Sequence, residues 1–438
     1  MKNIVLFFVV ISSLLTNVAQ AAEFISVGDK GRLITDSFFG LHIRYGTTKT
    51  PWPLVNFHSW RVITPETEWR GLQPSENKWN FSHLDKAVEL GKKNNVEILL
   101  TLGQTPFWAA SRPEEIVHNG AGASSEPRRL SDWENYIRTV AHRYKGKIKY
   151  YELWNEPRFR EVDPYRVMPG FTGTAVQMVE LGRIAKQVLR EEDPNAILIS
   201  PGIDAEFVGI PRVEQWFKAG GGDVTQVLSY HFYLRPPERM GKLYEKLRAI
   251  TVKYGYPNMP IFNTESGYYV QNPERPVAPK YPGTDYVFAK VLTPEEVGAY
   301  MIRAHLITAA AGLDRFYWYS WDILDMGLTR SYGNVHTTGS LAYGTMLNWL
   351  RNSVIKECAT DNDKTWICHL HRNGASAYVV WNIQGDEDFT IPAYMNVGEM
   401  ETITSRVSQL NGKKIPIGIS PILLRAKGVP WLPLAGKQ

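Results

Sequence analysis

Residues 150–157 read Tyr-Tyr-Glu-Leu-Trp-Asn-Glu-Pro, a mostly apolar run that ends in two polar side chains and a proline. A short apolar run bounded by a turn-forming residue predicts a buried β-strand. Asn155 and Glu156 would then lie at the carboxyl end of this strand, which is where barrel enzymes hold their reactive groups. The stretch therefore predicts both a strand and a candidate site at its end.

Seven other short apolar runs share this character between about Phe39 and Tyr343, and they alternate with longer amphipathic stretches such as Thr174–Glu192. This alternation is typical of βα units around a parallel sheet. Eight units predict an α/β fold, a (β/α)8 TIM barrel over residues 39–349. The eight expected strands are Phe39–Ile43, Ser59–Ile63, Val96–Leu102, Ile148–Trp154, Ala196–Ser200, Val227–Phe232, Pro260–Thr264 and Arg315–Tyr319.

From residue 350 to 438 the sequence consists of short alternating runs with turn residues between them. This pattern predicts a small C-terminal antiparallel β-sandwich domain. Residues 22–38 are candidates for further strands of the same domain. Its expected strands are Trp366–Arg372, Ala377–Asn382, Asp388–Pro392, Glu401–Val407 and Pro421–Leu424.

The first 21 residues have the pattern of a signal peptide. Lys2 precedes an apolar run over Ile4–Leu15, and Ala19-Gln20-Ala21 forms a small-x-small cleavage site. The run is too short for a stable membrane anchor. We therefore expect a periplasmic or secreted protein.

An oxidising compartment favours pairing of the two cysteines, Cys358 and Cys368. Turn-forming residues lie midway between them at positions 361–363. We therefore expect a disulfide that crosses a β-hairpin.

The composition excludes several classes of function. The net charge of +5 arises from 49 basic and 44 acidic side chains that are well mixed, so a nucleic-acid partner is not expected. Gly220-Gly221-Gly222 lacks the spacing and the lysine of a phosphate loop, and we infer no nucleotide cofactor. His369 and His371 would share one face of a strand while Cys368 points to the other, so we expect no metal. A monomer is favoured.

A second strand also ends in a carboxylate. Residues 261–267 read Ile-Phe-Asn-Thr-Glu-Ser-Gly, which places Glu265 on the seventh strand when Glu156 is on the fourth. Both side chains would face one cleft at the barrel mouth. Cleavage of a glycosidic bond needs two such groups, one that protonates the leaving oxygen and one that is ionised at the anomeric carbon.

On these motifs the chain resembles the large glycoside hydrolase clan whose acid/base and nucleophile glutamates follow barrel strands four and seven. Within the clan it is similar to family 39-like enzymes, and a secreted barrel with a small β-domain looks most like the biofilm exopolysaccharide endoglycosidases of the Psl type. The resemblance implies that Glu156 is the acid/base and Glu265 the nucleophile. It also implies that Asn155 bonds the sugar 2-hydroxyl.

Further candidates for substrate binding lie at strand ends. Arg61 on strand two would sit near the nucleophile, and an opposite charge favours an ionised carboxylate. The other candidates are Tyr233 and, with packing in the protein core as the alternative, His231, Trp318 and Trp108; His42, Trp69 and Glu66 are weaker candidates.

These observations predict a retaining endo-acting glycoside hydrolase that cleaves a polysaccharide, either a bacterial exopolysaccharide or a plant-type polymer. Two alternatives stay open: a non-catalytic polysaccharide-binding or secretion-scaffold protein on the same barrel, and an exo-acting enzyme similar to a β-xylosidase. The proline-rich segment Asn272–Pro294 follows the strand of Glu265. We expect it to form one wall of the cleft.

Overall fold

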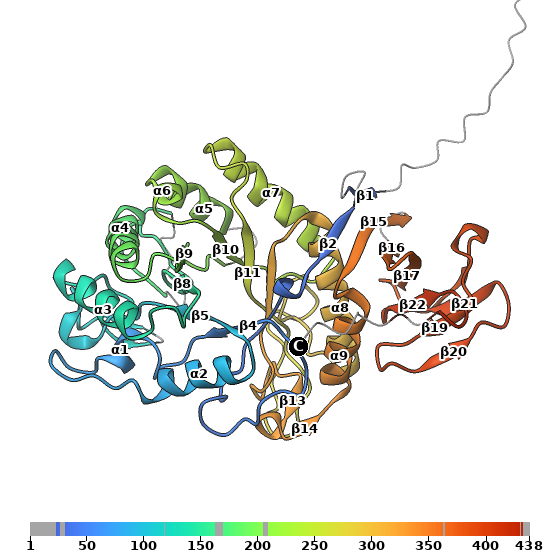
Figure 1. The fold of residues 1–438 in the computed structure, drawn as a ribbon, viewed down its shortest axis with the longest axis horizontal. Coiled ribbons are helices and arrows are strands. Elements are labelled where there is room, and N and C mark those ends of the chain that lie inside the picture. The colour runs from blue at the N-terminus through green and yellow to red at the C-terminus, as the bar shows by residue number, and fades with distance from the viewer. Residues whose placement is uncertain are drawn as a thin grey trace, which may run out of the picture.

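The computed structural model describes the backbone of residues 23–26 and residues 31–117, 119–162, 170–204, 209–361, 364–429 and 431. The predicted signal peptide at residues 1–21 lies outside the described residues. Figure 1 shows two parts: a ring of strands covered by helices at the left and centre, and an antiparallel sheet at the right. Within the described residues, no helix is both long and apolar enough to cross a bilayer.

The ring is an eight-stranded parallel sheet in the order β10-β11-β12-β3-β4-β5-β8-β9. Its two ends meet through a parallel bridge between Ile199 and Val227, which closes the barrel. All eight strands expected from the sequence are confirmed. They are β3 (Phe39–Leu41), β4 (Ser59–Val62), β5 (Glu97–Thr101), β8 (Tyr150–Glu152), β9 (Ile197–Ile199), β10 (Leu228–His231), β11 (Ile261–Ser266) and β12 (Arg315–Trp318).

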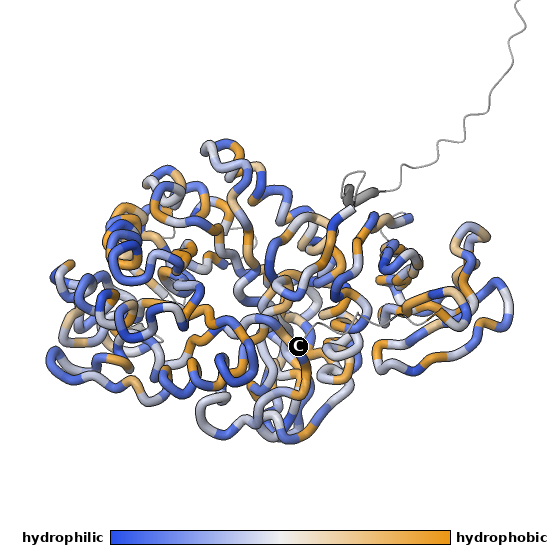
Figure 2. The backbone as a smooth tube through the Cα atoms, viewed as in Figure 1, coloured by the Kyte–Doolittle hydropathy of each residue, from blue (hydrophilic) through white to orange (hydrophobic). Residues whose placement is uncertain are grey.

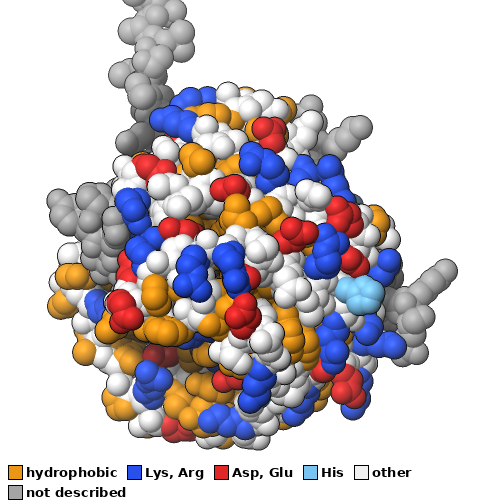
Figure 3. Space-filling view, turned by 90° about the vertical axis from the view of Figure 1, so that its left-hand side faces the viewer, with side chains coloured by type: hydrophobic (Ala, Val, Ile, Leu, Met, Phe, Trp, Pro, Cys, Tyr) orange, Lys and Arg blue, Asp and Glu red, His pale blue; other side chains and the backbone are white. Residues whose placement is uncertain are grey.

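Helices cover the outside of this ring, and Figure 2 shows hydrophobic and hydrophilic residues alternating along them. Three of the described helices begin at capping boxes, in which Thr174 pairs with Gln177, Thr293 with Glu296 and Thr337 with Ser340. The helices are α1 (Trp69–Leu72), α2 (Ser82–Lys93), α3 (Leu130–Arg143), α4 (Ala175–Glu192), α5 (Gly209–Lys218), α6 (Gly221–Val224), α7 (Arg239–Lys253), α8 (Pro294–Ala311) and α9 (Thr338–Leu350). On the face seen in Figure 3, basic and acidic side chains are interspersed, in keeping with the mixed charge of the sequence.

A compact apolar cluster fills the barrel interior near the amino ends of the strands. Arg315 lies against it, within cation–π distance of the rings of Tyr150 and Phe262. The buried members of the cluster are Leu99, Tyr150, Ile199, Val227, Phe262 and Tyr317. Because side chains close this end, polar groups at the carboxyl ends of the strands face an opening at the other end.

The C-terminal part is an antiparallel sheet in the order β1-β15-β16-β17-β22-β19-β20, and β2 also pairs with β15. Strands from both ends of the chain therefore share one sheet, as Figure 1 shows where β1 and β2 meet β15. Its strands are β1 (Glu23–Ser26), β2 (Arg32–Ile34), β15 (Ser353–Asp361), β16 (Thr365–Arg372), β17 (Ala375–Asn382), β22 (Ile422–Arg425), β19 (Glu399–Glu401) and β20 (Val407–Gln409).

A two-stranded ribbon of β18 (Glu387–Thr390) and β21 (Lys414–Ile417) covers one face of this sheet. Its Ile415 and Ile417 pack with Tyr378 and Leu424 of the sheet, so the layers form a small sandwich. The expected strand Glu401–Val407 is wrong: its two end residues belong to β19 and β20, and residues 402–406 form the turn of this hairpin, in which Ser405 has a φ of 61°. A left-handed residue ends a strand because it reverses the chain.

The disulfide expected between Cys358 and Cys368 is confirmed, and it joins β15 to β16. The sheet also bonds to the barrel through Glu238, which accepts hydrogen bonds from Arg303 and from Trp381 Nε1. The side chains of Glu238, Arg303 and Trp381 are buried, as are those of the two cysteines. The barrel and the C-terminal sheet are therefore joined by buried hydrogen bonds to Glu238.

Candidate active site

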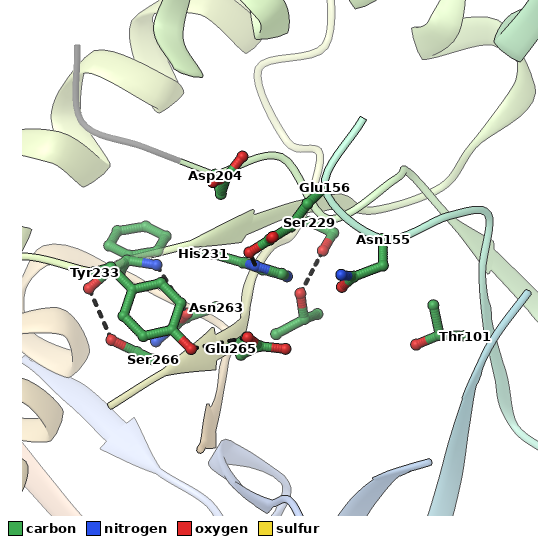
Figure 4. Close-up of polar contacts among 12 residues, drawn as sticks. Thr101, Asn155, Glu156, Asp204, Ser229, His231, Tyr233, Asn263, Glu265 and Ser266 are labelled. Atoms are coloured by element: carbon green, nitrogen blue, oxygen red, sulfur yellow. Dashed lines mark hydrogen bonds and ion pairs between the residues drawn. The ribbon is translucent and has the colours of Figure 1, made fainter. Parts of the chain in front are cut away.

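Glu156 lies just beyond the carboxyl end of β8. Its φ is 45°, a left-handed conformation that a non-glycine residue keeps only where surrounding structure holds it. The Glu156 N–H donates to Gly202 O at 2.9 Å, and Asn155 pairs with Gly202 in a parallel bridge. These contacts direct the Glu156 carboxylate into the barrel mouth, where 26% of the side chain is exposed (Figure 4).

Glu265 lies on β11, across the barrel mouth from Glu156. One carboxylate oxygen accepts a hydrogen bond from Tyr233 Oη at 2.8 Å, and the other accepts one from Arg61 Nη1 at 2.7 Å. A cation and a phenol therefore both donate to Glu265, an arrangement that stabilises the ionised form of a carboxylate. The side chain of Glu265 is 13% exposed.

The two glutamates are close together. One oxygen of Glu156, one oxygen of Glu265 and a ring nitrogen of His231 all lie within 4.8 Å of one another. Carboxyl groups about 5–5.5 Å apart are typical of retaining glycosidases, whereas inverting enzymes need roughly 6.5–9.5 Å to admit a water molecule. The close approach of the two carboxylates favours the shorter of these two arrangements.

Arg61 is the centre of the polar network below the two glutamates. It is 1% exposed and donates to Glu152 through Nε and Nη2, to Glu265 through Nη1, and to Asn155 Oδ1 through Nη2. Burial opposes the charge of Arg61, but Coulomb attraction to Glu152 and Glu265 outweighs it and raises the Arg61 pKa. The guanidinium is thus a fixed cation that orients both Glu265 and Asn155.

Glu152 is a site residue that the sequence reasoning missed. It is fully buried, and its carboxylate also accepts hydrogen bonds from Thr101 Oγ1 and Ser229 Oγ, each at 2.8 Å. A fully buried carboxylate requires a paired charge. The signal was present, because Glu152 is the one charged residue in the apolar run 150–154.

His231 bonds to Glu156 through Nδ1 at 3.0 Å. The ring is buried, and its Nε2 has no hydrogen-bond partner among the described residues. Burial lowers the pKa of His231, and the positive charge of Arg61 acts in the same direction, while Glu265 opposes it. A neutral imidazole therefore sits beside the Glu156 carboxyl group.

Tyr233 and Asp204 flank the pair of glutamates (Figure 4). Burial raises the pKa of Tyr233 well above its usual value, and the negative charge of Glu265 adds to the shift, so the phenol keeps its proton as a donor. Burial also raises the pKa of Asp204, as does the charge of Glu156, while hydrogen bonds from Arg158 oppose it. Asp204 is a second site residue that the sequence reasoning missed.

His42 lies on the floor of the site, where its Nε2 contacts Thr264 O at 2.8 Å. Burial lowers its pKa well below the usual value, and the charge of Arg61 reinforces this. Its ring lies 5.0 Å from that of Tyr319. His42 is therefore a neutral packing group beneath Tyr319.

The structure does not place Trp318 in the site. Its side chain is fully buried and packs on Phe316, Tyr268 and His305 of α8. Alternate residues of a strand point to opposite faces, so Trp318 faces the helices and the next residue, Tyr319, faces the barrel interior. Tyr319 is partly exposed and near enough to Glu265 for its charge to help raise the tyrosine pKa, although burial contributes more.

Three other expected contacts lie beyond this cluster. Trp69 is fully buried, stacks on Tyr136, and belongs to the core. Trp108 is partly buried, donates from Nε1 to Gln73 O, and meets the edge of Trp69. Glu66 is exposed. Within the described residues, no hydrogen bond joins Trp69, Trp108 or Glu66 to Glu156 or Glu265.

Glu156, His231 and Glu265 are the one group among the described residues whose ligand atoms are close enough together to hold a metal ion. All three already have partners in the network, and the Arg61 guanidinium donates directly to Glu265. A divalent cation at this point would be repelled by Arg61 at short range. The donor set fits acid/base chemistry better than metal binding.

Comparison of the sequence with known families shows that residues 34–200 fit the model of glycosyl hydrolase family 10. This segment includes Glu156 and ends before Glu265. The resemblance to family 39 noted from the motifs is thus accompanied by a sequence match to another glycosyl hydrolase family.

Curated relatives match over limited stretches. Endo-1,4-β-xylanase A of a Caldicellulosiruptor species is 34% identical over 100 residues, which is 22% of this chain and 15% of that protein. Endo-1,4-β-xylanase B of Thermotoga neapolitana is 25% identical over 169 residues, 36% of this chain and 46% of that protein. The chain therefore spans less than half the length of these relatives.

Solved structures match over nearly the whole chain. The family 39 enzyme of Xanthomonas axonopodis pv. citri has a TM-score of 0.58 at 12% identity, covering 90% of this chain and 95% of that one. The family 30 endoxylanase of Clostridium papyrosolvens has a TM-score of 0.60 at 10% identity, covering 92% and 99%. The chain is thus similar in sequence to family 10 glycosyl hydrolases over residues 34–200, and in fold to glycoside hydrolases of other families over most of its length.

Proposed function

We propose that the protein is a retaining glycoside hydrolase that acts by double displacement. The carrying observation is the pair Glu156 and Glu265, whose nearest oxygens lie within 4.8 Å of each other. The two environments differ: Glu265 receives hydrogen bonds from a cation and a phenol, whereas Glu156 has a neutral imidazole beside it. This difference supports Glu265 as the nucleophile and Glu156 as the acid/base.

In the first step, Glu265 attacks the anomeric carbon while Glu156 protonates the departing oxygen. In the second, Glu156 removes a proton from water, which attacks the glycosyl-enzyme and restores Glu265. Asn155, held by Arg61 with its amide at the mouth, is placed to bond the sugar 2-hydroxyl. Tyr233 keeps Glu265 oriented through both steps.

We further propose endo cleavage of a polysaccharide by a periplasmic or secreted protein. The pattern of residues 1–21 and the resemblance to secreted endoglycosidases support this, and the same resemblance supports a bacterial exopolysaccharide as the polymer. The curated relatives are named as endo-1,4-β-xylanases, which makes xylan the second polymer to test.

Incubation with purified exopolysaccharides and with xylan, followed by sizing of the products, tests the substrate proposal. Oligosaccharides from the start of the reaction support endo cleavage, and monosaccharide as the first product supports an exo-acting enzyme instead. No cleavage of any polymer, together with binding to one, supports a non-catalytic binding protein.

Two variants test the roles of the glutamates. Glu265→Gln should abolish turnover on every substrate. Glu156→Gln should still form the glycosyl-enzyme from an activated aryl glycoside, and azide should then release a product of retained configuration. Glu357→Gln, an exposed glutamate on β15, is the matched control. Azide rescue of Glu265→Gln with product of retained configuration would show that the roles are exchanged.

A further inference from the structure

A continuous row of aromatic rings leads away from Glu265 along the proline-rich segment that follows β11. Tyr233, which donates to Glu265, lies 5.6 Å from Phe288 between ring centroids. Phe288 lies 5.7 Å from Tyr286, and Tyr286 lies 5.5 Å from Tyr281. We name the outer pair, Tyr281 and Tyr286, the tyrosine platform.

The exposure of the rings increases along the row. Tyr233 and Phe288 are partly buried, Tyr286 is 43% exposed and Tyr281 is 71% exposed. Two large aromatic side chains that are adjacent and solvent-exposed are costly to keep in water without a function. Their rings offer flat apolar surface of the kind on which sugar rings stack.

Hydrogen bonds to backbone carbonyls hold the segment that carries the platform. The Lys280 N–H donates to Phe288 O at 2.8 Å, and Thr284 Oγ1 donates to Tyr281 O at 2.8 Å. Arg235, two residues after Tyr233, donates to the carbonyls of Thr284 and Tyr286. The platform is therefore attached to the same stretch that positions Tyr233.

The row of rings also approaches the acid/base, because the Tyr233 ring lies 6.3 Å from that of His231, whose Nδ1 bonds to Glu156. Asp204 is close enough to both Glu156 and Tyr286 for charge interactions with each. Figure 4 shows Asp204 beside Glu156, on the opposite side of His231 from Glu265. In a retaining glycosidase the leaving group departs toward the acid/base. Sugars of the leaving group would thus extend toward the tyrosine platform.

We propose that Tyr281 and Tyr286 form a binding subsite for sugar residues on the leaving-group side of the cleaved bond. This inference rests on the proposed function and deepens it, because it assigns one direction of the polymer to one wall of the cleft. The same subsite would hold an incoming sugar that replaces water in the second step, so it governs transfer to sugar acceptors as well as polymer cleavage.

The test compares the wild-type protein with the double variant Tyr281→Ala/Tyr286→Ala. Each lost stacking contact should reduce kcat/KM on the cleaved polymer by about 2- to 10-fold. For the two contacts together, the loss on the polymer should exceed the loss on an activated aryl glycoside by about 4- to 100-fold. When a sugar acceptor is added to the aryl glycoside reaction, the fraction of product formed by transfer should fall by a similar factor.

Tyr394→Ala is the matched control, because Tyr394 is 69% exposed and lies in the C-terminal sandwich. It should leave all three measurements unchanged. An unchanged transfer fraction in the double variant overturns the proposal, as does an equal loss on polymer and aryl glycoside. If the wild-type protein cleaves neither polymer nor aryl glycoside, the proposed function itself fails.

Discussion

Replacement of Gly202 by alanine tests whether the position of His231 controls the acid/base. A Cβ at this position would lie 2.5 Å from His231 Nε2 and 3.0 Å from Glu152 Oε1. Ordinary contacts between such atoms are about 3.5 Å, so the imidazole must move by roughly 1 Å. Gly202 does not have a left-handed backbone, so the substitution acts through this steric contact alone.

The displacement of His231 should weaken its hydrogen bond to Glu156. The Nδ1 contact of 3.0 Å would lengthen beyond the limit of about 3.2 Å for a good hydrogen bond. A misplacement of about 1 Å near reacting groups can cost on the order of 100-fold in rate. Because His231 contacts the acid/base rather than the nucleophile, the loss should fall on substrates whose leaving group needs a proton.

The assay is kcat/KM on the cleaved polymer and on a dinitrophenyl glycoside, whose leaving group needs no proton. We expect Gly202→Ala to lose on the order of 100-fold on the polymer and far less on the aryl glycoside. Gly344→Ala is the control, since its Cβ would meet only Val55 at 3.7 Å. Full polymer activity in Gly202→Ala, or an equal loss on both substrates, would refute the reasoning.

Three further outcomes are expected. Tyr233→Phe removes one of the two donors to Glu265 and should slow the burst of phenol release about 10- to 100-fold, and an unchanged burst contradicts the role given to this hydroxyl. Burial lowers the pKa of His305 to about 3, so the unfolded chain takes up the proton first as the pH falls below about 6.5. The folded state should thereby lose about 2 kcal/mol between pH 7 and pH 5 in urea unfolding, and His305→Phe should remove that part of the slope. Replacing Cys358 and Cys368 by serine opens a short loop and should cost about 2–3 kcal/mol in the same assay without changing activity, whereas a loss below about 1 kcal/mol contradicts the chain-entropy estimate.

The strands and the two glutamates could be predicted because their signals are local. An apolar run that ends in a carboxylate needs no knowledge of its neighbours, and this held for both Glu156 and Glu265. Glu152 was missed because its role depends on partners from three other strands, namely Arg61, Thr101 and Ser229. The lone charge in the apolar run 150–154 signals that Glu152 needs a partner, but it does not show which residues supply one.

The end of the last barrel strand shows a second limit of prediction from the sequence. The sequence offers Trp318 and Tyr319 side by side, and the larger ring is the more obvious choice for a sugar. Register decides otherwise: Tyr317 belongs to the interior cluster, so Tyr319 shares its face and Trp318 does not. The two-residue period of the strand, counted from Arg315, would have given the correct answer.

The sheet built from both ends of the chain sets an order for folding during synthesis. Strand β1 leaves the ribosome about 330 residues before its partner β15 is complete, on the order of 20–70 s at usual elongation rates. All eight barrel strands are made within that interval, so the barrel can assemble while β1 and β2 still lack a partner. Pairing of β1 and β2 with β15, and the Cys358–Cys368 bond between β15 and β16, can therefore form only after all eight barrel strands have been made.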